Sequence, residues 1–177
     1  NRHALVFAGA QKNFGPAGLT VVIVKKSLLG LAGETCPTML NYAVHAKAGS
    51  LYNTPPVFAI YMACLVTRWL KKEGGVAEMD RRARERSSLI YDVIDKSSGF
   101  YINRIAPEAR SRMNVVFHLA EDALTDLFVK EAADAGLVNL KGHRLAGGIR
   151  ASMYNALPME GAVALANFMK VFAARHG

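Results

Sequence analysis

Cysteine is scarce in this 177-residue sequence, and acidic residues are outnumbered by basic ones. The two cysteines, Cys36 and Cys64, have neither the spacing of a metal site nor that of a CxxC motif. We therefore expect two small buried thiols, no metal site and a reducing, cytoplasmic compartment. Aspartate and glutamate total 14 against 22 lysines and arginines, and the net charge of +8 permits binding of nucleic acid or of smaller anions.

The sequence has no apolar run long enough to cross a bilayer, which takes about 20 residues. The apolar run from Val57 to Thr67 is closed by Arg68, Lys71 and Lys72. We expect a buried helix there and no membrane association. Low-complexity segments and internal repeats are absent too, and 51% of the residues are hydrophobic, which is enough for one sizeable core or two small ones.

Aromatic residues are missing from the densest basic run, Met79 to Arg86. Glu78, Asp80 and Glu85 stand among its arginines at spacings that allow ion pairs along a helix. We expect a solvated helix face and no nucleic-acid partner, because stacking side chains and the known RNA- and DNA-binding motifs are both lacking. An anion- or RNA-binding protein remains the minor alternative.

An initiator methionine is also lacking, since the sequence opens on Asn1. The run from Leu5 to Ala8 has the pattern of a buried strand, yet nothing precedes it that could pair with it. We expect this sequence to be part of a longer polypeptide, so that a targeting segment can be neither found nor excluded.

The patterning predicts an α/β fold in the first part of the chain. Two strands, residues 5–8 and 19–24, flank a glycine-rich turn, and the second is apolar throughout, as in a strand covered on both faces. Thr54 can cap a helix whose first turn holds Pro55 and Pro56 and which ends near Lys72. A second helix, residues 76–95, carries an apolar stripe opposite its arginines. The stripe consists of Val76, Met79, Ala83, Ile90, Val93 and Ile94.

Beyond Ser97 the pattern changes to short strands and two helices, which indicates a smaller α+β unit. In residues 113–119 apolar side chains alternate with Asn114 and His118, as in a half-buried strand. The further expected elements are a helix from Glu121 to Gly136, strands at 137–140 and 149–154, a turn at 141–148 and an amphipathic helix from Pro158 through Val163, Met169 and Phe172.

Lys12 is the first candidate for chemistry. It follows a strand and precedes the turn at Gly15 and Gly18, and open α/β sheets place ligand sites where strands end. A solvated loop lysine is the commoner outcome for any lysine. The alternative is a lysine whose neutral amine attacks a carbonyl group.

Two further segments have the residues of anion sites. In KGHRLAGGIRASMYN, His143, Arg144 and Arg150 lie close to two glycines that let the backbone approach a ligand. In YNTPP, Asn53 and Thr54 stand just before a helix start, where phosphate binds well. Each segment also has a simpler reading, as a surface turn with ordinary cations and as a helix cap.

Together, the segments AGAQKNFGPAGLTVVIV, LYNTPPVFAIY, RSRMNV and KGHRLAGGIRASMYNA resemble the phosphoserine aminotransferase family, whose members are class V, fold-type I enzymes dependent on pyridoxal phosphate. The resemblance spans nearly the whole chain. It implies that residues 1–78 are the end of the large cofactor-binding domain, a mixed sheet with helices, and that residues 79–177 are the small α+β carboxyl-terminal domain. It also reverses the preference for a solvated Lys12.

The resemblance implies roles for particular residues. Lys12 would join covalently to pyridoxal phosphate and move a proton at the substrate Cα, and Gln11 would contact the cofactor phosphate. Asn53 and Thr54 would reach the cofactor phosphate of a neighbouring subunit, which implies a homodimer with shared active sites. Arg150 would bind the substrate α-carboxylate. His143 and Arg144 would face the substrate phosphate or the side-chain carboxylate of glutamate.

The implied reaction is transfer of an amino group between L-glutamate and 3-phosphohydroxypyruvate, which gives O-phospho-L-serine and 2-oxoglutarate in serine biosynthesis. Both substrates carry several negative charges, which suits the cluster of basic residues. The family's segments before the lysine, with an aspartate for the pyridine nitrogen and an aromatic stacked on the ring, are missing. We therefore expect little activity from this chain alone. The alternatives are another class V aminotransferase and a non-catalytic fragment that needs the missing half.

Overall fold

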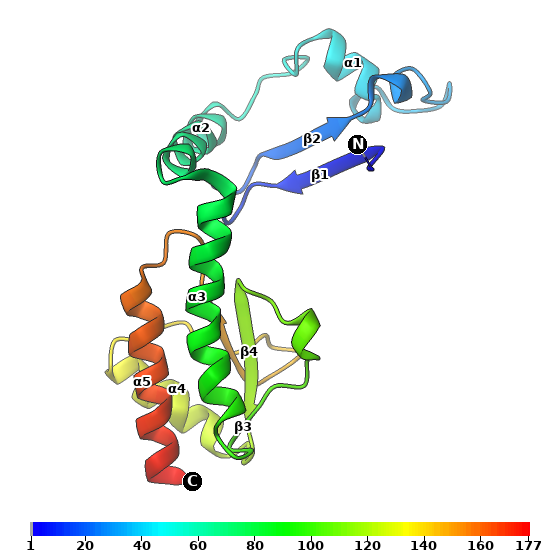
Figure 1. The fold of residues 1–177 in the computed structure, drawn as a ribbon. Coiled ribbons are helices and arrows are strands. Elements are labelled where there is room, and N and C mark those ends of the chain that lie inside the picture. Colours follow the sequence, from blue (N-terminus) through cyan, green and yellow to red (C-terminus); the bar gives the residue numbers. More distant parts are fainter. Residues whose placement is uncertain (1) are drawn as a thin grey trace. The chain divides into compact units, whose positions relative to one another are not determined.

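The computed structural model describes residues 2–177 and divides into two compact units (Figure 1). The first unit ends at Lys72, and the second is Glu73–Gly177. The division lies in the short link between two helices, α2 (Val57–Lys72) and α3 (Gly75–Asp95). The boundary expected between residues 78 and 79 falls inside α3.

The first unit contains a two-stranded antiparallel sheet. Strand β1 (Leu5–Gly9) pairs with β2 (Thr20–Val24) in a register that runs from Leu5 opposite Val24 to Gly9 opposite Thr20. Both strands lie where the sequence predicts them, within one residue at one end. The remaining elements are two short 3-10 helices, η1 (Lys26–Leu28) and η2 (Thr38–Leu40), the helix α1 (Tyr42–Lys47) and α2.

The expectation that these elements are buried is wrong for this unit by itself. Phe7 on β1 is 70% exposed and Ile23 on β2 is 67% exposed, so that neither strand is covered on both faces. Helix α2 buries only Ala59 and Ala63. Its large apolar side chains remain exposed because the unit offers no further layer of structure to cover them.

Two smaller expectations for this unit are also wrong. Helix α2 begins at Val57 instead of at the prolines, and the carbonyl of Pro56 accepts the first helical hydrogen bond, from Ile60 (3.0 Å). The helix therefore starts three residues beyond Thr54, which does not occupy the cap position expected of it. The thiols are less buried than expected, since Cys64 is exposed and Cys36 is half-buried; both are free.

The second unit is an α+β fold, as the sequence predicts. Its antiparallel sheet has the order β3–β4–β5 and its helices pack against that sheet. Figure 1 shows α3 and the last helix lying side by side. The elements are α3, β3 (Tyr101–Ile102), η3 (Pro107–Ala109), β4 (Asn114–Leu119), α4 (Leu124–Asp134), β5 (Ile149–Ser152) and α5 (Met159–His176).

The core of this unit follows from alternation along β4. Val115, Phe117 and Leu119 are at most 2% exposed, while the side chains between them are half-buried on the other face. Phe128 of α4 is fully buried at the centre, where its ring lies 5.0 Å from that of Phe172 of α5 and makes further edge-on contacts. This packing fixes the sheet against α4 and α5.

The strand expected at 137–140 is not formed. Gly136 and Asn139 both have left-handed backbone conformations, with φ of +82° and +62°, which an extended strand does not allow. Pairing with β5 is limited to a bridge between Lys141 and Ile149 and one hydrogen bond from Arg150 N to Leu140 O (2.8 Å). Strand β5 also stops at Ser152 instead of Tyr154.

Helix α3 confirms most of its predicted pattern. Its expected stripe is buried except for Val76, which is 87% exposed in the first turn. The expected ion pairs along the helix are present, with Arg81 bound to Glu78 and Glu85, and Arg84 bound to Asp80. Arg86 differs, because it is buried instead of lying on the solvated face.

Candidate functional site

Lys12 stands on a turn that directly follows β1 and is closed at a single buried residue. Ala10 is 1% exposed, and its N–H donates to Leu19 O (2.8 Å). Its carbonyl accepts from the backbone N–H groups of both Lys12 and Gly15. The side chain of Lys12 is exposed. The turn therefore holds the Lys12 backbone firmly while leaving its amine accessible.

Two glycines fit this turn closely. At Gly9 the amide of Gln11 folds back over the backbone, so that a Cβ there would displace the end of the Gln11 side chain. A Cβ on Gly15 would lie 3.4 Å from the Cα of Ala63, in the middle of α2. The Lys12 turn thus packs on α2 at Gly15.

Asn53 and Thr54 lie on the segment that leads into the same helix. Both are exposed, and the Asn53 side chain donates only to the adjacent Thr54 carbonyl (3.3 Å) among the hydrogen bonds of the described chain. Helix α2 has 16 residues and no acidic side chain in its first turn. Its amino terminus therefore suits a phosphate group, because the helix dipole there favours a negative charge.

In the second unit, His143 and Arg144 lie on a tight turn before β5, and both are exposed. The turn is closed by a hydrogen bond from Gly142 N to Gly148 O (2.8 Å). The ring Nδ1 of His143 accepts from Leu145 N (3.3 Å), which orients the imidazole. The backbone fold of the turn thus presents both side chains to solvent.

The glycines of this turn are required by its geometry. A Cβ on Gly142 would collide with the carbonyls of Gly147 and Gly148. Gly148 has φ of +63°, and a Cβ there would lie 2.6 Å from Phe117 O and 2.9 Å from the ring of His118. Only glycine allows so close an approach in this conformation.

Arg150 lies on β5, half-buried, opposite Val116 of β4. It lines a cavity of about 530 Å³ together with Tyr154 and Leu157. Its Nε is buried and has no hydrogen-bond partner among the residues that the structure describes. A buried donor without an acceptor is costly, so this guanidinium fits a ligand that brings an acceptor such as a carboxylate.

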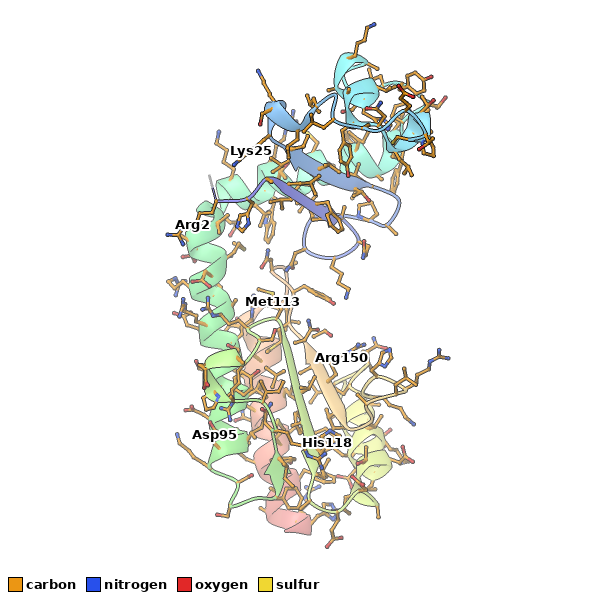
Figure 2. All side chains as sticks on the ribbon, turned by 90° about the vertical axis from the view of Figure 1, so that its right-hand side faces the viewer. Arg2, Lys25, Asp95, Met113, His118 and Arg150 are labelled. Atoms are coloured by element: carbon orange, nitrogen blue, oxygen red, sulfur yellow. The ribbon has the colours of Figure 1, made fainter. Side chains whose placement is uncertain are left out.

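The same face of the sheet carries polar residues beyond the candidates predicted from the sequence. Figure 2 shows His118 and Arg150 on the neighbouring strands β4 and β5. Asn114 accepts a hydrogen bond from the Ser152 hydroxyl across the same two strands (3.0 Å). The available signal was the alternation that placed Asn114 and His118 opposite the apolar face.

The candidates fall into two sets. Those for the cofactor, Gln11, Lys12, Asn53 and Thr54, all lie in the first unit around α2, and those for substrate, His143, Arg144 and Arg150, all lie in the second unit around β5. Each unit thus carries one of the two sets. We found no group of three or more possible metal ligands among residues 2–177, and no helix there that is long and apolar enough to span a membrane.

Comparison with solved structures gives two strong similarities. The chain is 48% identical to the phosphoserine aminotransferase from Bacillus circulans subsp. alkalophilus, with a TM-score of 0.94. The matched region covers 98% of this chain and 48% of that protein. It is 42% identical to the pyridoxal-phosphate-bound phosphoserine aminotransferase from Trichomonas vaginalis, with a TM-score of 0.87 and coverages of 94% and 48%. The chain thus spans about half the length of these proteins.

A third structure, the phosphoserine aminotransferase from Cytophaga hutchinsonii, is 22% identical with a TM-score of 0.79, which shows the shared fold alone. The resemblance seen in the sequence motifs is confirmed at the level of the family. The family described as aminotransferase class-V matches residues 4–165, which is most of the sequence. The chain therefore belongs to the class-V aminotransferases.

Proposed function

We propose that this protein is a phosphoserine aminotransferase and that the chain is its carboxyl-terminal half. The observation that carries the proposal is the group of anion-binding side chains formed by His143, Arg144 and Arg150 around the start of β5. Within residues 2–177, none of the three forms an ion pair, whereas nearby Lys141 is paired with Asp126. Two arginines without an ion pair among those residues, of which Arg150 lines a cavity, suit a substrate with several negative charges.

The proposed cofactor is pyridoxal phosphate, which supplies an electron sink for the charge that develops at the substrate Cα. The residues of the first unit fit it. Lys12 offers an exposed amine on a backbone fixed by Ala10, and its roles would be to bind the cofactor covalently and to hold or deliver the proton at Cα. Gln11 would contact the cofactor phosphate beside Lys12, whereas Asn53 and Thr54, just before α2, would reach the cofactor phosphate of a neighbouring subunit.

The proposed substrates are L-glutamate and 3-phosphohydroxypyruvate, and the products are 2-oxoglutarate and O-phospho-L-serine. Arg150 would bind the α-carboxylate common to both substrates, because a guanidinium binds a carboxylate through two parallel hydrogen bonds. His143 and Arg144, which are exposed on the preceding turn, would bind the second anionic group. Two anion sites of this kind fix the orientation of the substrate as well as its affinity.

We further propose a homodimer with shared active sites, located in the cytoplasm. The support for the dimer is the apolar surface beside Asn53 and Thr54, where Tyr52, Val57 and Phe58 are 52%, 68% and 71% exposed. Apolar patches of this kind mark interaction surfaces. The support for the compartment is the pair of free thiols.

A steady-state transaminase assay tests the function. L-Glutamate and 3-phosphohydroxypyruvate are supplied to the chain alone and to the chain co-expressed with the preceding half of the polypeptide. We expect turnover in the second case and little in the first. Lys12→Ala should abolish turnover, whereas Lys26→Ala, at an exposed lysine of the same unit, should leave it unchanged.

The choice of 2-oxo acid that accepts the amino group distinguishes this function from its alternatives. Equal turnover with an unphosphorylated 2-oxo acid would favour another class V aminotransferase, because the second anion site would then be unused. Absence of turnover in the mixture, despite stable association of the two halves, would favour a non-catalytic fragment.

A further inference from the structure

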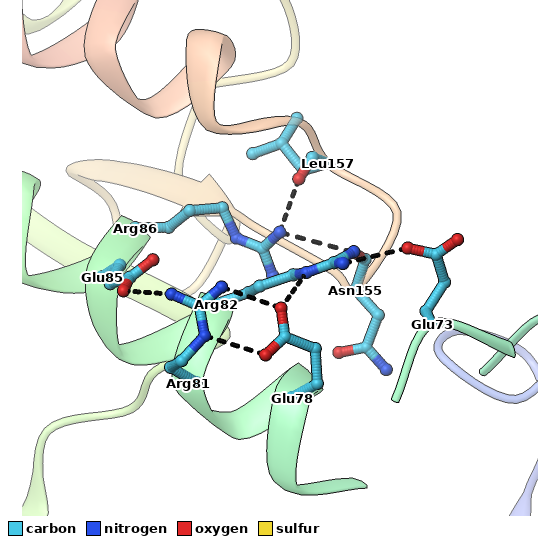
Figure 3. Close-up of polar contacts among 8 residues, drawn as sticks. All are labelled: Glu73, Glu78, Arg81, Arg82, Glu85, Arg86, Asn155 and Leu157. Atoms are coloured by element: carbon cyan, nitrogen blue, oxygen red, sulfur yellow. Dashed lines mark hydrogen bonds and ion pairs between the residues drawn. The ribbon is translucent and has the colours of Figure 1, made fainter. Parts of the chain in front are cut away.

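Arg86 is the one arginine of the run at 81–86 whose side chain is buried among the described residues. It is 2% exposed, on the face of α3 that packs inside the second unit. Its neighbours Arg81 and Arg82 are ion-paired with Glu73, Glu78 and Glu85 (Figure 3). Arg86 forms no ion pair within residues 2–177, so its charge lies in the interior without a counter-ion.

The Arg86 guanidinium reaches across to a distant segment of the chain. Its Nη1 donates to two backbone carbonyls, Asn155 O (3.3 Å) and Leu157 O, as Figure 3 shows. These acceptors lie on the link between β5 and α5, which follows Arg150 by only a few residues. Two hydrogen bonds from a charged donor therefore tie this link to α3.

The link forms part of the cavity that Arg150 lines. Tyr154 and Leu157 lie on its wall. Leu157 also packs at the start of α5, where a Cβ on Gly161 would come within 3.3 Å of its Cδ1. Leu157 is therefore held on both sides, at its carbonyl by Arg86 and at its side chain by α5.

Burial makes this arrangement costly. Desolvation, with the nearby charge of Arg82, lowers the pKa of Arg86 below its ordinary value. Its Nε and Nη2 are buried and have no hydrogen-bond partner among the described residues. An apolar side chain would avoid both costs, so the charge is explained best by the two carbonyls that it binds.

We propose that Arg86 is a positioning residue, which fixes the Asn155–Leu157 link and thereby sets the cavity wall against which Arg150 binds a substrate carboxylate. The inference rests on the proposed function for the identity of the ligand. The tie between α3 and the link does not depend on that function.

The test compares Arg86→Met and Arg86→Lys with Arg84→Met, a control on an exposed arginine of the same helix. The enzyme is used in whichever form shows turnover in the assay above. We expect Arg86→Met to raise KM for L-glutamate about tenfold while kcat falls less than about threefold, because ground-state positioning of the carboxylate is lost. Arg86→Lys should recover part of the loss, and the control should match the wild type.

Hydrogen exchange provides a readout that does not depend on activity. The amides of residues 154–158 should exchange about tenfold faster in Arg86→Met than in the wild type, and those of β4 should be unchanged. An unchanged KM together with unchanged exchange in the folded variant would overturn the proposal. So would a lowered melting temperature with neither effect, which is the result expected of a purely structural role.

A further measurement covers the case in which Arg86→Met does not fold. In the wild type, the Arg86 Nη1 protons should exchange slowly in 15N NMR spectra, because they are buried and hydrogen-bonded. Fast exchange of these protons would overturn the proposal. Absence of transaminase activity in the wild type would contradict the proposed function and leave the exchange results to decide the role of Arg86.

Discussion

Gly148 shows how single residues shape the turn that presents His143 and Arg144. A side chain at 148 meets both a left-handed backbone conformation and the carbonyl of Phe117. His118 adds its ring to the same contact. The turn, the sheet and the candidate anion site are therefore linked at one residue.

Gly148→Ala should lower the free energy of unfolding by about 2–3 kcal/mol, since strain at positive φ and a steric clash add together. Gly147→Ala is the matched control, because Gly147 has a similar φ of +67° but open space around it. It should cost only about 1 kcal/mol. Urea unfolding followed by circular dichroism measures both, and equal effects of the two substitutions would contradict the role assigned to the clash.

Lys12 and Arg86 mark the limits of residue-level prediction from the sequence. The position of Lys12 after a strand and before a glycine turn is set by local sequence, and the structure places it there. Burial of Arg86 depends on carbonyls about 70 residues away. No local pattern distinguishes it from the exposed arginines beside it.

At the level of elements, acidic residues of α3 are bound to arginines both along the helix and on the link that follows β3. Two hydrogen-bonded arginines, Arg81 and Arg82, lower the pKa of Glu78 from 4.5 to about 2. Arg84 and Arg112 lower the pKa of Asp80, and Arg110 lowers that of Asp95. Arg112 and Arg110 lie on the link between β3 and β4, so the latter two pairs join that link to the helix.

These shifts predict a loss of stability in acid. A carboxyl group whose pKa is lower in the folded state stabilises the fold above its unfolded pKa, and the contribution is lost as the pH falls through the folded pKa. The urea midpoint should therefore fall as the pH is lowered from about 5 to about 2. The effect of each exposed pair should be small.

Asp95→Asn tests this expectation, because the Arg110 pair joins α3 to the link before β4 with two hydrogen bonds of 2.7 and 2.8 Å. The variant should be less stable than the wild type near pH 6, and the difference should shrink in acid. A difference that stays constant down to about pH 2 would contradict the assignment, because protonation of Asp95 would then have no effect.

Prediction of elements succeeds where the signal is local. Strand β4 has strict alternation, and it lies within one residue of the predicted range. The strand expected at 137–140 does not form, because the backbone at Gly136 and Asn139 is left-handed and not extended. Whether an apolar run pairs as a strand depends on the partner's free edge, which the sequence does not show.

At the level of the whole molecule, the apolar residues of β1, β2 and α2 were predicted correctly as strand and helix formers, but their expected burial is wrong for this unit. Periodicity reports which side chains can be buried. It does not report which chain covers them. Local patterns likewise do not report which residues complete the candidate site, because its cofactor and substrate sets lie in different units.

The proposed homodimer is tested at this scale by light scattering coupled to gel filtration. Phe58→Glu places a charge on the exposed apolar surface beside Asn53 and Thr54, and it should shift the mass from that of a dimer to that of a monomer. Val171→Glu, at a half-exposed position on α5, is the control and should leave the mass unchanged. A dimer that persists in Phe58→Glu would contradict this interface.

The measurement that tests the central claim most directly is chemical labelling of the lysines. The protein is incubated with pyridoxal phosphate, reduced with borohydride, digested and analysed by mass spectrometry. We predict a pyridoxyl group confined to Lys12, because hydrogen bonds to Ala10 fix its backbone at the end of β1, where the proposed cofactor site lies. Label spread over surface lysines such as Lys25 and Lys26, or no label, would contradict the assignment of Lys12 as the cofactor-binding residue.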